Sequence, residues 1–376
     1  MIKKDSIKSL ETIRCLAFLG VFFSHSDINS RFLAGSGMWG VSVFLILSGF
    51  LAVYNHLDSN DFEDYSISYS FKYAVNKMKK IWPLHLITLF IMVLFEAIGK
   101  DRFQLMFLSL KAFLNALLVQ EWIPLKGRSI NGVTWYLCVT LFSYYITPFF
   151  INKMRKKCNV KKAFVSIAVL FGLQIILGYI GSLLPTPYEI DFIDYDLCNW
   201  FVYKFPLVRI IDYIIGCFLG YIFINVKDKN IVRCNLFEII SIVVVVISST
   251  VLGYLRYLTV INGGDQTVAN NMWWGYTIIF TINTCLLVYY FAINKGILSK
   301  LLTNKVTSYI SKISSYAYLI HNVVNRFLLF AVQHSSNEYY SYYLWLLKIT
   351  IGLLITLILS ELWRRFVSTK KRPISN

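Results

Sequence analysis

The sequence predicts an all-α fold, a polytopic bundle of about ten transmembrane helices with both termini in the cytoplasm. Three observations support this. The 376 residues are 57% hydrophobic and 17% aromatic, with a mean hydropathy of +0.58, which is too apolar for an ordinary soluble domain. Apolar segments long enough to cross a bilayer recur along the whole chain. The short connections between them are rich in lysine and arginine, as cytoplasmic loops are.

The predicted spans follow from the rule that about 20 apolar residues cross the hydrocarbon core of a bilayer. They cover residues 9–27, 38–55, 80–98, 132–151, 163–183, 206–226, 235–256, 272–292, 312–332 and 342–363. The lysine-containing start of the chain has no small-residue cleavage site after it, so the first span is expected to be retained rather than removed as a signal peptide.

Segment 103–120 is a further apolar candidate, interrupted by Lys111. Counting it as a span would place the loop 152–162, which has six basic and no acidic residues, outside the cell. We therefore expect an outer-face or re-entrant helix there. The acidic loop 185–205 then also lies outside.

The net charge of +17 does not indicate a nucleic-acid-binding protein, because the basic residues lie in short loops between apolar segments. The seven cysteines are scattered singly, without ligand-like spacing. We expect neither disulfides nor a bound metal.

The stretch from Arg14 to Phe50 combines a basic residue, a histidine and several glycines. The eleven helical steps from Arg14 to His25 make three turns plus about 20°, so both side chains share one stripe and lie roughly 16 Å apart. Charged or titratable groups inside a membrane are costly unless they face a protected cavity, and they indicate function. Gly37, Gly40 and Gly49 are expected to allow close helix packing.

Lys77 and Lys80 share a helix face just before the third span. They fit a seat for a phosphorylated ligand. They also fit ordinary snorkelling lysines at a cytoplasmic boundary, and the sequence leaves both interpretations open.

Four further motifs accompany Arg14 and His25. They are GMWGVSVFLILSGF (37–50), KMKKIWPLH (77–85), GVTWYLCVTLFSYYITP (132–148) and SSYAYLIHN (314–322). In this order and spacing, the set resembles the bacterial acyltransferase family 3, integral membrane enzymes that acylate surface sugars. The resemblance runs over nearly the whole chain, so residues 1–376 are expected to form one membrane-embedded acyltransferase domain.

The resemblance implies transfer of an acyl group, acetyl being the one expected, from cytoplasmic acyl-CoA to a hydroxyl of an exported or lipid-linked cell-surface polysaccharide. It implies a multi-pass protein of the bacterial cytoplasmic membrane, with membrane lipid, the acceptor glycan and either a second copy or glycan-synthesis machinery as partners. His25 matches the family's essential histidine and Arg14 its first-helix arginine. Lys77 and Lys80 stand where the family usually has an Arg-x-x-Arg pair, and Thr140 where many members have glutamate.

Histidine suits this chemistry because its ordinary pKa of about 6.5 makes neutral imidazole available to take a proton from a sugar hydroxyl. An acyl-histidine intermediate is an alternative. Ser24, Ser26 and Trp135 are candidate donors to the oxyanion.

Several alternatives remain open on the sequence alone. Glu11 lies three residues before Arg14 and could pair with it structurally. His321 and Asn325 share a helix face, which predicts either interhelical hydrogen bonds or, together with Trp135, a wall of the acceptor path. The rival functions are a transporter or flippase of a glycan or lipid intermediate, and a non-catalytic partner of a glycan synthase.

Overall fold

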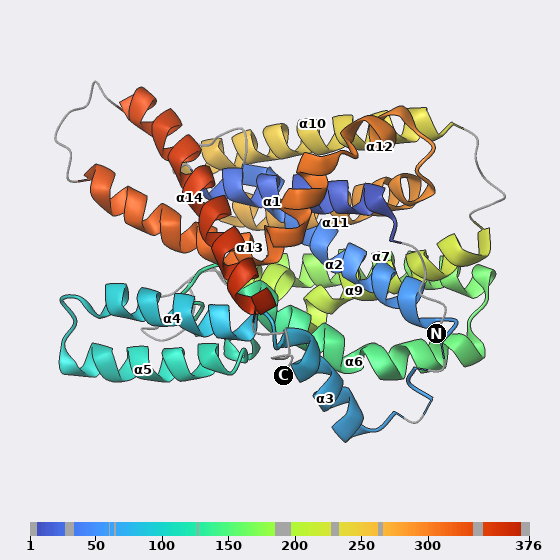
Figure 1. Ribbon diagram of the computed structural model, residues 1–376, viewed down its shortest axis with the longest axis horizontal. Helices are drawn as coiled ribbons and strands as arrows, with labels where there is room; N and C mark the ends of the chain where they lie inside the picture. The colour runs from blue at the N-terminus through green and yellow to red at the C-terminus, as the bar shows by residue number, and fades with distance from the viewer. Residues whose placement is uncertain are drawn as a thin grey trace, which may run out of the picture.

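The computed structural model describes residues 6–26, 34–59, 61–63, 65–125, 128–184, 197–226, 233–261, 266–333 and 341–369. Within these ranges the protein consists of helices joined by loops, without a β-strand, which confirms the all-α class (Figure 1). In chain order the helices are α1 (Lys8–Ser26), α2 (Ala34–His56), α3 (Ile67–Met78), α4 (Trp82–Ala97), α5 (Arg102–Ala116), the 3-10 helix η1 (Gln120–Trp122), α6 (Trp135–Lys157), α7 (Val160–Ser182), the short α8 (Leu197–Asn199), the π-helix η2 (Trp200–Lys204), α9 (Pro206–Val226), α10 (Cys234–Ile261), α11 (Gln266–Ile293), α12 (Ile297–Leu302), α13 (Lys305–Gln333) and α14 (Ser341–Thr369).

Each of the ten predicted spans coincides with a helix. Four of these helices, or five if the bent pair α3 and α4 is counted as one span, are long and apolar enough by themselves to cross a membrane, judged over the described residues. The protein is therefore a helical membrane protein. The count of ten spans and the cytoplasmic position of both termini stay predictions.

Residues 103–116 of the segment 103–120 lie in helix α5, which runs antiparallel to α4 as a hairpin (Figure 1). Its start is fixed by a capping box, in which the Asp101 side chain accepts from the backbone N–H of Gln104 and Gln104 returns a bond to Asp101. The structure thus confirms a helix there, and its position relative to the membrane stays a prediction.

Helix α2 lies at the centre of the bundle, packed on α1 on one side and on α9 on the other. Glycines make this packing close. A β-carbon added to Gly40 would overlap the carbonyl oxygen of Ala17 in α1, and one added to Gly49 would overlap that of Tyr213 in α9. At Gly37 it would overlap the Ser24 side chain. These contacts confirm the predicted role of the three glycines, since only a residue without a side chain lets the backbones approach so closely.

Helix α3 precedes α4 with a bend of 66° between them. Its Tyr69 and Phe71 are exposed, whereas Ala74 and Met78 are buried. Such an amphipathic helix at the start of an apolar one is typical of an element that lies along the membrane surface.

Candidate active site

His25 stands at the last turn of α1, where its side chain is exposed. Its Nδ1 lies 2.8 Å from the carbonyl oxygen of Val21, one turn earlier. A carbonyl oxygen only accepts hydrogen bonds, so Nδ1 carries the proton in the neutral ring. The lone pair is therefore on Nε2, which has no hydrogen-bond partner among the described residues. A neutral imidazole held in one tautomer with a free nitrogen is the form that a general base requires.

His321 of α13 lies against His25, with the two ring centroids 5.2 Å apart. Its side chain is fully buried between the rings of Phe22 and Tyr318. A hydrogen bond links the same two helices, because the Asn325 side-chain amide donates to the backbone carbonyl of His25 over 3.3 Å. The structure thus brings the helix face that His321 and Asn325 share against His25, the predicted base on α1.

Arg14 lies in the N-terminal half of α1, whereas His25 lies at its C-terminal end. The Arg14 side chain is half-buried. Its charge acts on the hydroxyls of Tyr136 and Tyr144, both on α6. Within the described part of the chain Arg14 forms no hydrogen bond and no ion pair, and Glu11 is not paired with it. The structural alternative of a Glu11–Arg14 ion pair is therefore not what the fold uses Arg14 for.

A row of aromatic rings joins the surroundings of Arg14 to His25. The rings of Tyr136 and Tyr318 have centroids 5.3 Å apart, and those of Tyr318 and His321 are 5.9 Å apart. Tyr136 lies in the field of Arg14 at one end, and His321 contacts His25 at the other. A row of ring contacts, which we call the tyrosine wall, thus leads from Tyr136 through Tyr318 and His321 to His25.

The two candidate lysines lie at the end of α3. Lys77 is on α3, with its ammonium 5.1 Å from the centre of the Tyr73 ring, and Lys80 is exposed in the turn before α4. The two lysines thus stand at the bend between α3 and α4, whereas Arg14 comes from α1.

Trp135 begins α6 and is buried, with its ring 4.7 Å from that of Tyr203 in the π-helix η2. Lys204, the next residue, is close enough for its charge to act on His25. The sequence interpretation missed Tyr203 and Lys204. A signal was present in the sequence, since they end the acidic loop 185–205 with a basic residue, but it was weak.

The two serine hydroxyls that were candidate oxyanion donors form hydrogen bonds to backbone carbonyls of their own helix. Ser24 donates to the carbonyl of Val21 over 2.8 Å, and Ser26 donates to that of Phe22 over 2.6 Å. Thr140, where many family members have glutamate, donates to the carbonyl of Tyr136. Each bond lies within its own helix, as is usual for serine and threonine in apolar helices.

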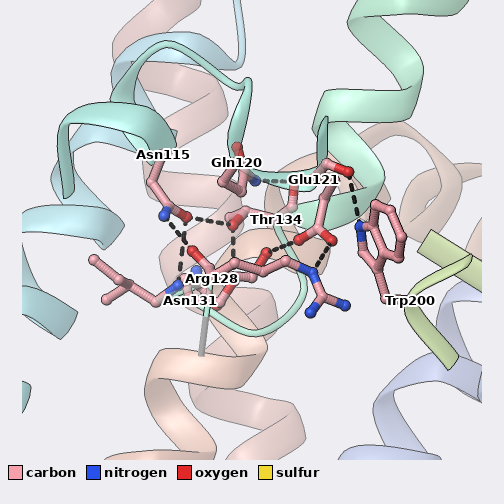
Figure 2. A network of polar contacts seen from close by, with 9 residues as sticks. Asn115, Gln120, Glu121, Arg128, Asn131, Thr134 and Trp200 are labelled. Atoms are coloured by element: carbon pink, nitrogen blue, oxygen red, sulfur yellow. Dashed lines mark hydrogen bonds and ion pairs between the residues drawn. The ribbon is translucent and has the colours of Figure 1, made fainter. Parts of the chain in front are cut away.

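Residues 117–125 and 128–134, between α5 and α6, form a buried polar network that the sequence did not suggest (Figure 2). Glu121 and Arg128, both almost fully buried, form an ion pair of 2.5 Å. The Glu121 carbonyl also accepts from the Trp200 indole over 3.0 Å, which ties the loop to η2. At its other end Asn131 donates to the carbonyl of Leu319, next to the helix turn that carries His321. The network therefore bonds to both η2 and α13, the helix that carries His321.

A second buried ion pair lies inside the predicted span 206–226. Arg209 and Asp212 are one turn apart on α9, 2.8 Å from each other and at most 1% exposed. Asp212 also accepts from Gln174 of α7 and Thr281 of α11, while Arg209 donates to Ser42 of α2 and covers the Tyr203 ring. The sequence does contain a signal for this cluster, because two ionisable residues stand within an apolar span. The cluster itself was not predicted.

Comparison with known proteins bears on what this arrangement does. The chain matches the family model described as an acyltransferase domain over residues 7–362, which is nearly its whole length. No curated protein and no solved structure matches it. The matched region contains both ends of the Arg14–His25 stripe, its tyrosine wall and His321. By its sequence and its helical membrane fold, the protein belongs to acyltransferase family 3.

Proposed function

We propose that this protein transfers an acyl group, with acetyl the one expected, from cytoplasmic acyl-CoA to a hydroxyl of an exported or lipid-linked cell-surface polysaccharide. The observation that carries the proposal is the state of the two α1 side chains. His25 presents an unprotonated, unpartnered Nε2, and Arg14 is a cation left without a partner among the described residues. Family membership favours an enzyme of acyl transfer over the rival transporter.

Arg14 is the proposed ligand of a CoA phosphate. A guanidinium forms short, charge-assisted bonds to phosphate oxygens, and an arginine that no carboxylate neutralises is available for them. Lys77 and Lys80 are proposed to add positive charge on the cytoplasmic side, with the lysine ammonium giving no bidentate contact.

The pantetheine arm is proposed to follow the tyrosine wall from Arg14 towards His25. Arg14 and His25 are separated by about 16 Å along the helix, a distance the extended arm can bridge. The rings of Tyr136 and Tyr318 offer an apolar surface along this path. The donor would thus stay on the cytoplasmic side while its thioester reaches the base.

At His25 the reaction proceeds by proton transfer and substitution. Nε2 takes the proton of the acceptor hydroxyl, the oxygen attacks the thioester carbon, the carbon–sulfur bond breaks and CoA leaves as the thiolate. Neutral imidazole is regenerated when the proton is released. Trp135, His321 and Asn325 are proposed to border the acceptor side of this site.

The test uses purified protein in liposomes loaded with radiolabelled acetyl-CoA and supplied with cell-envelope glycans outside. We expect label to move to the glycan with wild type and with Lys8→Gln, a control that removes an exposed charge from the same helix. His25→Ala should abolish the transfer at equal amounts of folded protein. Transfer that persists in His25→Ala contradicts the assigned base. Absence of turnover in wild type, repeated with succinyl-CoA, contradicts acyl-CoA as the donor.

A further inference from the structure

We infer that His321 is a positioning residue for His25. Once His25 has taken up the proton of the acceptor hydroxyl, His321 accepts a hydrogen bond from it. The inference rests on the proposed function, because it requires His25 to be the base. In this role His321 contacts the reacting His25 ring and does not contact the substrate.

The starting observation is an unpaired nitrogen in the interior. His321 Nδ1 lies 3.2 Å from the carbonyl oxygen of Ala317, so Nδ1 carries the proton and Nε2 has the lone pair. Nε2 is buried and has no hydrogen-bond partner in the part of the chain that the structure describes. A buried acceptor without a partner lowers the stability of the fold. Such a group in a native protein requires an explanation.

The resting state explains why the two histidines form no bond with each other. Both rings donate Nδ1–H to a carbonyl of their own helix, so both Nε2 atoms are acceptors. Two acceptors cannot share a hydrogen bond. The centroid distance of 5.2 Å is nonetheless close to that of two imidazoles joined by an N–H···N bond, about 5 Å.

Proton uptake by His25 changes this relation. In the imidazolium both nitrogens are donors, and Nδ1–H already has the Val21 carbonyl. Nε2–H loses its first partner when the acceptor oxygen becomes part of the ester. The lone pair of His321 Nε2 is then a buried, unpaired acceptor on the ring that packs against His25.

A neutral imidazole suits this position better than a carboxylate. The site lies among the rings of Phe22 and Tyr318, and Lys204 adds a like charge near His25. A carboxylate buried there would stabilise the cation only at the cost of its own desolvation. A lone pair on an uncharged ring stabilises the imidazolium without that cost.

The contacts of His321 argue against a purely structural role. Its hydrogen bond goes to its own helix, one turn back, so among the described residues it gives no hydrogen bond from α13 to α1. That connection is made by Asn325, which donates to the carbonyl of His25. A phenylalanine ring could occupy the aromatic surroundings of His321 without loss of any interhelical hydrogen bond.

The experiment replaces His321 with Phe, Met and Gln in the full chain and measures kcat, KM for acetyl-CoA and thermal stability. One hydrogen bond to a charged group accounts for roughly a 10- to 150-fold change. We therefore expect Phe and Met to lower kcat by that factor with KM unchanged. Gln, whose Oε1 can accept, should recover a large part of kcat. His85→Gln is the matched control, since His85 is equally buried and also has an unpaired ring nitrogen, but its hydrogen bond goes to the Asn115 carbonyl of α5.

Each other result overturns the inference. Wild-type kcat in the Phe or Met variant shows that no acceptor is needed at this position. Equal losses in Phe, Met and Gln that follow thermal stability show a structural role alone. Failure of the proposed function gives a different result, which is full activity of His25→Ala. The His321 inference is tested only if His25→Ala is inactive.

Discussion

Neutralising Asp212 should destabilise the fold far more than neutralising both members of its ion pair. Asp212 and Arg209 lie 2.8 Å apart and are at most 1% exposed. Asp212→Asn leaves a buried guanidinium without its counter-charge, which costs roughly 3–5 kcal/mol in the free energy of unfolding. The Asn oxygen can still accept from Gln174 and Thr281, so the loss reports the missing charge rather than these two hydrogen bonds.

The double variant Arg209→Met/Asp212→Asn removes both charges and keeps an unbranched, adaptable side chain at 209. We expect it to be more stable than Asp212→Asn alone, by roughly 2 kcal/mol or more. Unfolding in mixed detergent micelles, followed by tryptophan fluorescence, completes the double-mutant cycle with the two single variants. Additive losses, or a double variant that is less stable than Asp212→Asn, would refute the argument that the uncompensated charge sets the cost.

Three more predictions follow from particular contacts. Gly49→Ala should sharply reduce the yield of folded protein, because its β-carbon would overlap the Tyr213 carbonyl, whereas Gly172→Ala, with open space around it, should be tolerated in the same expression and thermal-stability assay. Arg14→Gln should raise KM for acetyl-CoA by about 10-fold or more without changing thermal stability, since it removes a proposed phosphate contact but no ion pair; an unchanged KM in steady-state kinetics would count against the donor site. For Asp61, partial burial alone would raise the pKa of the carboxyl, but hydrogen bonds from His56 and Ser59 bring that pKa below its ordinary value. This contribution to stability is complete above the ordinary pKa of about 3.9 and is lost as the pH falls through the lower, folded pKa, so melting temperatures measured against pH should converge for wild type and Asp61→Asn in acid.

The sequence alone determined where the helices lie along the chain and which functional side chains share one face of α1. Apolar length and periodicity are local properties, so every predicted span lies in a helix, and Arg14 and His25 could be placed on one stripe of α1 before any contact was known. The family motifs are equally local, and the match to the acyltransferase model confirms them. The close-packing glycines Gly40 and Gly49 were also recognisable, although not their partners.

Only the tertiary structure decided which helices meet. Asn325 contacts His25 across 300 residues of sequence, and His321 lies beside it, because α13 crosses α1 at that turn. The same holds for Asp212, whose partners come from α7 and α11. Helix crossing depends on how whole side-chain surfaces interlock, which no periodicity along one segment contains. The sequence therefore identified a base, and the packing of the bundle supplied its neighbour.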